Sequence, residues 1–337
     1  MLKIKLFRCL SGLAVCCTAL AAAAAGPSAV YVFGDSLSDT GNVAEKVYKT
    51  NFLNPPSYHD SFTNGKVAAE VLAETYGLKA DPSLWANRFR DQHRLFGRGF
   101  KPGTNYAVGG ATATDRGVAF LKLDLPEQVN AFITHVAGTG SVPADALYAV
   151  IIGGNDVRTA AQALNTSFIT SGVASELAQL QLLISRGAKN LLVVGVPDVS
   201  VIPEFTTGPA DEAAAARADS LLYNSNLQAG IANLRVANPL VKITYFDLLA
   251  FNANLLASAA TYGFANTTEP CYTSDVLTTP VTTSPGCGPV TPSGAANIDQ
   301  FIYFDVIHPT ARVHALWAQG MAAALASFAG LTPTSPD

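Results

Sequence analysis

The sequence has few charged residues, no dense cluster of basic residues and no internal repeat, and each absence excludes a class of protein. Charged residues make up 14% of the 337 positions and hydrophobic residues 49%, which argues against disorder and supplies a large core. No lysine and arginine cluster is present to bind nucleic acid, and no fixed period indicates a solenoid. A chain of this length fits one large α/β domain.

The N-terminal segment also lacks the length of strong apolar sequence that a membrane anchor needs, which is about 20 residues. Its basic start, alanine-rich run and Ala-x-Ala end are typical of a secretory signal peptide. We predict cleavage after residues 1–25 and a secreted or periplasmic protein without a stable membrane anchor. Removal of this segment would leave 18 basic against 25 acidic residues, which disfavours adhesion to anionic membranes. Lipidation at Cys16 or Cys17 is an alternative, although Val15 is bulkier than a lipobox favours.

Only two of the five cysteines follow the predicted signal peptide, and both lie in one Pro/Thr-rich stretch. In an oxidising compartment, Cys271 and Cys287 are expected to form a disulfide, which would stabilise the fold by about 3 kcal/mol through loop closure. Free thiols are the alternative. A metal site is less favoured because no histidine or second cysteine pair lies nearby.

Short, continuously apolar runs alternate with helical patterns. Such runs are typical of parallel strands buried on both faces, so we predict an α/β fold, a three-layer α/β/α sandwich with a central parallel sheet. One domain is expected over residues 26–330, followed by a polar tail at 331–337. The predicted strands are 28–33, 147–154, 190–196, 241–246 and, more weakly, 104–110. The predicted helices are 64–77, 167–188, 210–236 and 310–329.

Polar residues that follow the predicted strands form a complete set for acyl transfer. Ligands of such sheets bind beyond the carboxyl ends of the strands. Ser36 lies on a turn after the first strand, where it is a candidate nucleophile with its own N–H facing a developing oxyanion. Gly110 and Asn155 would supply two further donors. His308 is the candidate base, and Asp305 would orient its imidazole. Each motif alone is more often an ordinary turn or helix cap.

One tripeptide competes with this interpretation, because Asp-Thr-Gly at 39–41 is also the active-site sequence of aspartic proteases. Those enzymes need two such loops that share a proton, and this chain has one. We therefore interpret Asp39 as a helix-capping or hydrogen-bonding group. The remaining histidines are expected to be surface or packing residues; they are His59, His93, His135 and His314.

Four sequence blocks, in order, resemble those of the GDSL or SGNH hydrolases. They are GDSL at 34–37, NYAVGGAT at 105–112, GGND at 153–156 and DVIHPT at 305–310. The resemblance covers nearly the whole chain after the predicted signal peptide. It is strongest to a secreted bacterial branch that includes lecithinase/haemolysin-like phospholipases and the glycerophospholipid–cholesterol acyltransferase. The resemblance implies the flavodoxin-like SGNH fold and ester hydrolysis without a cofactor or a metal.

Carried over block by block, the resemblance assigns the same five residues to the site. The nucleophile falls on Ser36, the base on His308 and the acid on Asp305. Counting five residues on from Asn105 favours Gly110 over Gly109 as the glycine donor. The amide donor falls on the asparagine of GGND. The loop at 265–300 is short relative to the acyltransferase, which disfavours acyl transfer to a sterol.

The resulting prediction is a secreted serine carboxylester hydrolase, an esterase or lipase that acts through an acyl-enzyme on Ser36. Its partner would be a small-molecule or lipid ester, with no nucleic acid, and the protein is expected to be a monomer. Phospholipase, acyltransferase or polysaccharide acetylesterase activity at the same site remains an alternative, and so does a non-catalytic secreted binding module. The segment 79–103 is a candidate substrate loop. Candidate pocket residues are Phe62, Trp85, Phe89, Phe96 and Phe100, and core packing explains these side chains equally well.

Overall fold

The computed structural model describes residues 26–43, 56–85, 103–115, 123–138, 140–273, 282–291 and 294–333. Several sequence predictions therefore fall outside the described residues. They concern the signal peptide at 1–25, most of the candidate substrate loop, the end of the polar tail, and Phe89, His93, Phe96 and Phe100.

A parallel four-stranded sheet forms the middle of the domain, with the order β1-β2-β3-β4. The four strands pair without a shift in register, because each residue of one strand has a partner in the next along the whole strand. At least four of the five residues of β1, β2 and β3 and three of the five residues of β4 are buried, as expected where helices cover both faces of a parallel sheet. The strands are β1 (Val30–Gly34), β2 (Leu147–Ile151), β3 (Asn190–Val194) and β4 (Lys242–Phe246).

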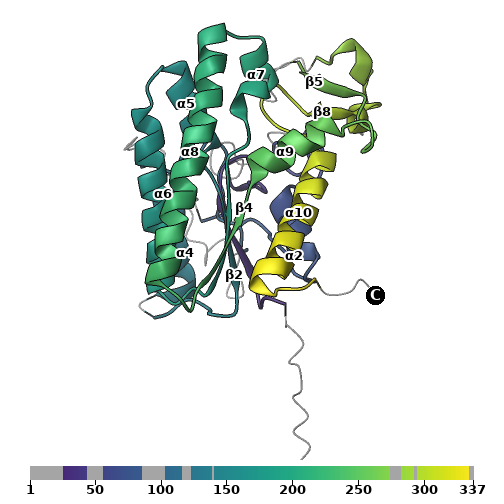
Figure 1. The fold of residues 1–337 in the computed structure, drawn as a ribbon. Helices are drawn as coiled ribbons and strands as arrows, with labels where there is room; N and C mark the ends of the chain where they lie inside the picture. The colour runs from purple at the N-terminus through teal and green to yellow at the C-terminus, as the bar shows by residue number, and fades with distance from the viewer. Residues whose placement is uncertain are drawn as a thin grey trace, which may run out of the picture.

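Helices cover both faces of this sheet (Figure 1). On one face lie α4 (Leu125–Phe132), α5 (Gly154–Gln162), α6 (Ser167–Ser185) and α8 (Ala210–Ala237). On the other lie α2 (Ala68–Glu74), α9 (Leu248–Ala257) and α10 (Ala311–Ala329). The predicted three-layer α/β/α sandwich is therefore confirmed. Among the helices of the described ranges, none combines the length and apolar character needed to cross a membrane.

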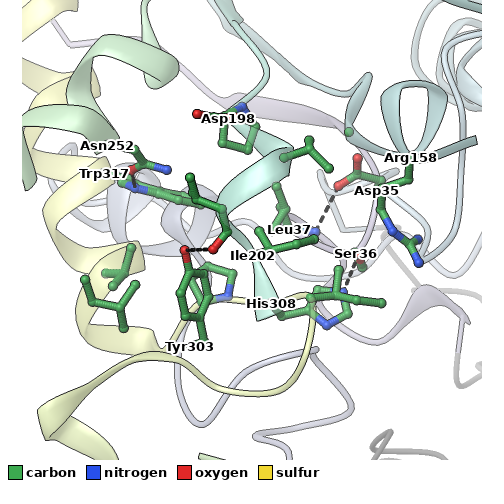
Figure 2. A pocket seen from close by; sticks show the side chains of 18 of the residues that line it. Asp35, Ser36, Leu37, Arg158, Asp198, Ile202, Asn252, Tyr303, His308 and Trp317 are labelled. Carbon is green, nitrogen blue, oxygen red and sulfur yellow. Dashed lines mark hydrogen bonds between the residues drawn. The ribbon is translucent and has the colours of Figure 1, made fainter. Parts of the chain in front are cut away.

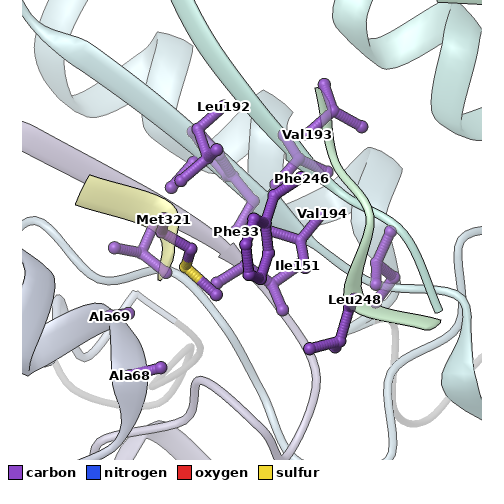
Figure 3. Packing of buried hydrophobic residues seen from close by; sticks show 14 of the residues in the cluster. Phe33, Ala68, Ala69, Ile151, Leu192, Val193, Val194, Phe246, Leu248 and Met321 are labelled. Atoms are coloured by element: carbon purple, nitrogen blue, oxygen red, sulfur yellow. The ribbon is translucent and has the colours of Figure 1, made fainter. Parts of the chain in front are cut away.

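Packing around β4 shows how the second helical layer meets the sheet (Figure 3). Phe33, Leu192 and Met321 belong to one buried cluster that joins the strands to α10. A side chain at Gly320 would collide with the rings of Phe246 and Phe251. The absence of a side chain at this position therefore lets α10 lie directly against the ring at the end of β4.

The prediction of a regular strand at 104–110 is wrong. The segment makes only isolated bridges, one of them between Asn105 and Val32 of β1. It nevertheless runs beside β1, because Tyr106 donates its N–H to the Val32 carbonyl and Val108 donates to the Gly34 carbonyl. The side chain of Asn105 accepts the N–H of Ala107, two residues on, so local hydrogen bonds replace a continuous ladder. The segment therefore still ends beside the end of β1.

A small lobe between α9 and α10 carries the cysteine pair. Cys271 and Cys287 form a disulfide, with Cα atoms 5.2 Å apart. Both are buried in a second hydrophobic cluster with Tyr272 and Phe304. Strands β5 and β8 pair within this lobe, and β8 ends two residues before Asp305. The elements of the lobe are β5 (Asn266–Pro270), η3 (Pro285–Cys287), β6 (Val290–Thr291), β7 (Gly294–Ala295), η4 (Ile298–Gln300) and β8 (Phe301–Tyr303).

Three short helical segments complete the described elements. They are η1 (Ile133–Ala137), η2 (Val199–Val201) and α7 (Pro203–Thr206). Of these, η2 and α7 follow β3 and contact the long helix α8. They therefore extend the carboxyl edge of the sheet, where ligands of such folds bind.

Candidate active site

Ser36, His308 and Asp305 form a continuous line of hydrogen bonds at the carboxyl edge of the sheet; Figure 2 shows the contact between Ser36 and His308. The Ser36 hydroxyl lies 2.8 Å from Nε2 of His308. On the other side of the ring, Nδ1 lies 2.8 Å from Oδ2 and 3.0 Å from Oδ1 of Asp305. All three side chains are buried. This is the geometry of a nucleophile, a base and an orienting carboxylate.

The position of Ser36 follows from the end of β1. A side chain at Gly34 would collide with the Ile151 carbonyl of β2, so glycine lets the two strands stay close up to the turn. The Asp35 carbonyl then accepts the N–H groups of Ser38 and Asp39. This tight turn leaves Ser36 between the strand and the following segment, at the edge of the sheet.

The loop that carries the base is built around Asp305. One carboxylate oxygen accepts the N–H groups of Ile307 and His308, at 2.8 and 2.7 Å. The same carboxylate contacts the imidazole, so a single side chain shapes the turn and orients the ring. The hydroxyl of Thr63 donates to the Pro309 carbonyl at 2.9 Å. The loop is therefore held from within and from a segment far away in the sequence.

The two candidate glycine donors differ in the structure. Gly109 donates its N–H to Asp39 Oδ2 at 2.7 Å, so that hydrogen already has an acceptor. Gly110 has a φ of +80°, and the position of its missing side chain faces open space. The next residue, Ala111, accepts a hydrogen bond from the Asn155 side chain. The preference for Gly110 over Gly109 as the donor stays a prediction.

Asp39 has the capping role that the sequence suggested. Besides Gly109, its carboxylate accepts the N–H groups of Gly41, Asn42 and Val43. Burial raises the pKa of Asp39 to about 6, and these N–H donors partly oppose that shift. The carboxylate thus connects the turn after Ser36 to the glycine segment.

Asn155 lies in the first turn of α5 and shares the cleft with Ser36 and His308. Its side-chain Nδ2 donates to the Ala111 carbonyl at 2.9 Å. Its Oδ1 accepts a hydrogen bond of 3.1 Å from Arg158. Within the described part of the chain, the second amide hydrogen of Asn155 has no acceptor. One donor of this amide thus remains for a ligand.

Three polar residues of the site were given no role from the sequence. Burial raises the pKa of Asp35 to about 6, while the Leu37 N–H, His308 and Arg158 act in the opposite direction. Asp35 accepts that Leu37 N–H at 3.0 Å, and its position next to Ser36 was the only available signal. Arg158 and Glu204 form an ion pair beside Asn155. Their contact joins segments 46 residues apart, which no local pattern indicates.

A mainly apolar cleft of about 730 Å³, including its open mouth, begins at the Ser36–His308 pair. It extends between the segment after β3 and helices α9 and α10, and at the side far from Ser36 in Figure 2 lie Trp317 and Asn252. Trp317 Nε1 donates to Asn252 Oδ1 at 2.7 Å. The apolar lining residues are Leu37, Pro197, Val199, Val201, Ile202, Leu255, Leu256, Ile302, Tyr303, Ile307, Pro309, Val313 and Trp317.

Of the aromatic residues predicted for a pocket, the two described ones, Phe62 and Trp85, do not line this cleft. Phe62 packs instead against the imidazole of His308, with ring centroids 5.1 Å apart. Trp85 packs against Val108 and Leu123 and donates its Nε1–H to the Tyr106 carbonyl. Both residues pack locally because hydrophobicity alone does not determine which surface a side chain faces. Phe89, Phe96 and Phe100 lie outside the described residues.

Of the other histidines, His314 is a packing residue, as predicted. Its Nδ1 accepts the N–H of Ala68 at 3.2 Å, and burial lowers its pKa to about 3, with a smaller contribution from His308. His59 and His135 are exposed. None of these three contacts Ser36 among the described hydrogen bonds.

Comparison with known proteins establishes the family. A family model described as GDSL-like Lipase/Acylhydrolase matches residues 30–321. The chain belongs to this family. The resemblance noted from the four blocks is thus confirmed. The GDSL family is one of carboxylic ester hydrolases, the enzyme class that the sequence predicted.

Relatives of this GDSL chain include proteins from bacteria and plants. The thermolabile hemolysin of Vibrio parahaemolyticus is 27% identical over 301 residues, which cover 87% of this chain and 62% of the hemolysin. The chain therefore spans less than two thirds of that relative. A GDSL esterase/lipase of Arabidopsis thaliana is 28% identical over 276 residues and 72% of each chain. A GDSL-like lipase structure from Parabacteroides merdae aligns over 89% of this chain and 96% of its own, with 12% identity and a TM-score of 0.42.

Proposed function

We propose that the protein is a serine carboxylester hydrolase that forms an acyl-enzyme on Ser36. The observation that carries this proposal is the line of contacts from Ser36 through His308 to Asp305. That line begins at the mouth of an apolar cleft. A non-catalytic binding module would have no use for a buried imidazole held between a hydroxyl and a carboxylate.

In the acylation step, Nε2 of His308 takes the proton of Ser36 as Oγ attacks the ester carbonyl. Electron density moves to the carbonyl oxygen, which becomes an oxyanion. The N–H groups of Ser36 and Gly110 and the free amide hydrogen of Asn155 would stabilise this charge. Collapse of the intermediate breaks the ester C–O bond, and His308 returns its proton to the leaving alcohol.

In the deacylation step, a water molecule takes the place of the alcohol. His308 removes a proton from the water, whose oxygen attacks the acyl carbon. The bond between the acyl carbon and Ser36 Oγ then breaks, and His308 returns the proton to the serine. Asp305 stabilises the imidazolium in both steps without exchanging a proton itself. The products are one carboxylic acid and one alcohol.

The composition of the cleft supports an aliphatic acyl chain as the group that it holds. Most of its lining side chains are hydrocarbon or aromatic, and burial of each methylene group contributes about 0.8 kcal/mol to binding. An acetylated polysaccharide would instead require many polar groups facing the sugar hydroxyls. We therefore favour a lipase or esterase for apolar acyl groups over a polysaccharide acetylesterase.

The disulfide and the N-terminal sequence support export of the enzyme. Structural disulfides persist in oxidising compartments, and the Cys271–Cys287 bond lies in the lobe that leads into Asp305. We propose a secreted or periplasmic enzyme that acts after residues 1–25 have been removed.

The test uses protein lacking residues 1–25 and p-nitrophenyl esters from acetate to palmitate, with a phospholipid and an acetylated xylan alongside. We expect hydrolysis of the p-nitrophenyl esters, more efficient for acyl chains longer than acetate. Ser36→Ala should abolish it while the melting temperature stays close to that of the wild type. Equal turnover by Ser36→Ala would overturn the proposal. Preference for the xylan would retain the mechanism and overturn the substrate class.

A further inference from the structure

Arg158 contacts the candidate oxyanion donor rather than the nucleophile or the base. It lies one turn after Asn155 on α5, and residues three apart share one face of a helix. Its Nη1 donates to Asn155 Oδ1 at 3.1 Å. Arginine only donates hydrogen bonds and a backbone carbonyl only accepts them. The two contacts of Asn155, to Arg158 and to the Ala111 carbonyl, therefore allow a single orientation of its amide.

Two further hydrogen bonds, both to Glu204, hold the guanidinium of Arg158 in place. Nε of Arg158 donates to Glu204 Oε2 at 2.7 Å, and Nη2 donates to Oε1 at 2.6 Å. Both side chains are about one quarter exposed. Such a two-bond contact fixes the plane of the guanidinium as well as its position. The carboxylate also balances the positive charge, so the pair presents little net charge to the cleft.

Glu204 connects this pair to the loop that carries His308. Its backbone N–H donates to the Val306 carbonyl at 2.9 Å, and Val306 lies between Asp305 and His308. A second bond, from the Tyr303 hydroxyl to the Val201 carbonyl, attaches the same region at 3.0 Å. One chain of contacts thus runs from the base loop through Glu204 and Arg158 to the amide of Asn155.

We propose that Arg158, held by Glu204, is a positioning residue that directs the free amide hydrogen of Asn155 towards the oxyanion. This inference rests on the proposed function. The guanidinium of Arg158 fixes the plane of the Asn155 amide. The backbone hydrogen bond of Glu204 to Val306 fixes the Arg158–Glu204 pair relative to the loop that carries His308. Without Arg158, Oδ1 of Asn155 loses its donor and the amide can rotate about its last torsion. A donor that is displaced by a fraction of its hydrogen-bond length stabilises the transition state less.

The test is a double-mutant cycle in which kcat and KM are measured with p-nitrophenyl butyrate. We expect Asn155→Ala to lower kcat by about 10²- to 10³-fold with little change in KM. Arg158→Ala should lower kcat by about 10- to 100-fold, again with little change in KM. In the Asn155→Ala background, Arg158→Ala should have almost no further effect, because there is no amide left to position.

Conservative variants separate orientation from charge. Arg158→Lys keeps the positive charge but cannot hold Glu204 and Asn155 with one planar fork, so we expect a loss close to that of Arg158→Ala. Glu204→Gln is isosteric and should give a smaller loss in the same direction. Arg217→Ala serves as the control, because Arg217 pairs with Asp198 and has no hydrogen bond to Asn155 among the described residues; its kcat should equal that of the wild type.

Several outcomes would overturn the inference. An equal loss from Arg158→Ala with and without Asn155 would mean that Arg158 acts elsewhere. Wild-type kcat in Arg158→Lys would mean that only its charge matters. A rise in KM confined to a phospholipid substrate would make Arg158 a headgroup contact. If Ser36→Ala remained active, the proposed function itself would fail, and that result is independent of the cycle.

Discussion

The backbone N–H of Gly109 donates a 2.7 Å hydrogen bond to the carboxylate of Asp39. Two sequence blocks that lie 70 residues apart are joined by this contact. The tripeptide that begins at Asp39 could be mistaken for a protease motif, whereas its aspartate anchors the segment that ends at Gly110. The loss of this anchor should therefore affect both stability and catalysis.

We expect Asp39→Ala to lower the free energy of unfolding by about 1–3 kcal/mol, because four buried or partly buried N–H groups lose their acceptor. It should also lower kcat, because Gly109 and the neighbouring Gly110 are no longer fixed relative to Ser36. Chemical denaturation and ester kinetics on one preparation measure the two effects. Asp247→Ala is the control, since Asp247 accepts the Ala250 N–H at an exposed helix start. Unchanged kcat in Asp39→Ala would contradict the anchoring role.

Asp305→Asn should retain the fold and lose most of the activity. The amide oxygen of asparagine still accepts the N–H groups that shape the turn, but it cannot stabilise an imidazolium as a carboxylate does. We expect kcat to fall by about 10³- to 10⁴-fold, with a nearly unchanged melting temperature. Full activity would show that His308 is oriented by another group.

Trp317→Ala should shift the chain-length preference towards longer acyl groups. Trp317 lines the cleft at the side far from Ser36 and is almost fully buried, so its removal lengthens the space available to an acyl chain. We expect kcat/KM to rise for long p-nitrophenyl esters relative to short ones. Phe328→Ala is the control on the same helix, because Phe328 is exposed and lies outside the cleft. An identical profile in the two variants would refute a role in the choice of chain length.

Glu176 should make the protein less stable as the pH rises from about 4.5 to about 8. Burial raises its pKa from 4.5 to about 8, with the Tyr223 hydrogen bond lowering it and Asp156 raising it further. Between these two pH values the folded state keeps a proton that the unfolded state releases, so this contribution to stability is full below about pH 4.5 and is lost as the pH rises through about 8. Glu176→Gln cannot ionise and should show a smaller decrease in melting temperature across that range. Glu269→Gln is the control at an exposed position, and its melting temperature should decrease as much as that of the wild type.

The positions of the site residues were predictable because most of the blocks follow a strand. Ser36 and Asn155 come shortly after β1 and β2, which are adjacent in the sheet, so a parallel arrangement brings them to one edge. His308 was predictable as the base from the nearby Asp305. The segment 104–110 was predicted as a regular strand, but hydrogen bonds made by the side chain of Asn105 replace part of the ladder.

The shape of the cleft and the contacts that support the site were not predictable in the same way. Trp317 and Asn252 belong to different helices, and their contact depends on how α9 and α10 pack. The Arg158–Glu204 pair likewise joins two segments with unremarkable sequences. Both features depend on tertiary distances, whereas sequence patterns reflect local periodicity and turn chemistry. The sequence therefore indicated the candidate reactive groups but not the residues whose contacts hold them in position.

The contact between Ser36 and His308 joins positions 272 residues apart. A ribosome must therefore finish nearly the whole domain before the nucleophile can meet its base. A growing chain that has reached β7 already has Ser36, Gly110 and Asn155 but neither Asp305 nor His308. Under the proposed mechanism, ester hydrolysis would therefore report that the loop with Asp305 and His308 has closed onto the first strand. The appearance of ester hydrolysis could then be used to time the final stage of folding, because incomplete chains that lack Asp305 and His308 would not hydrolyse the ester.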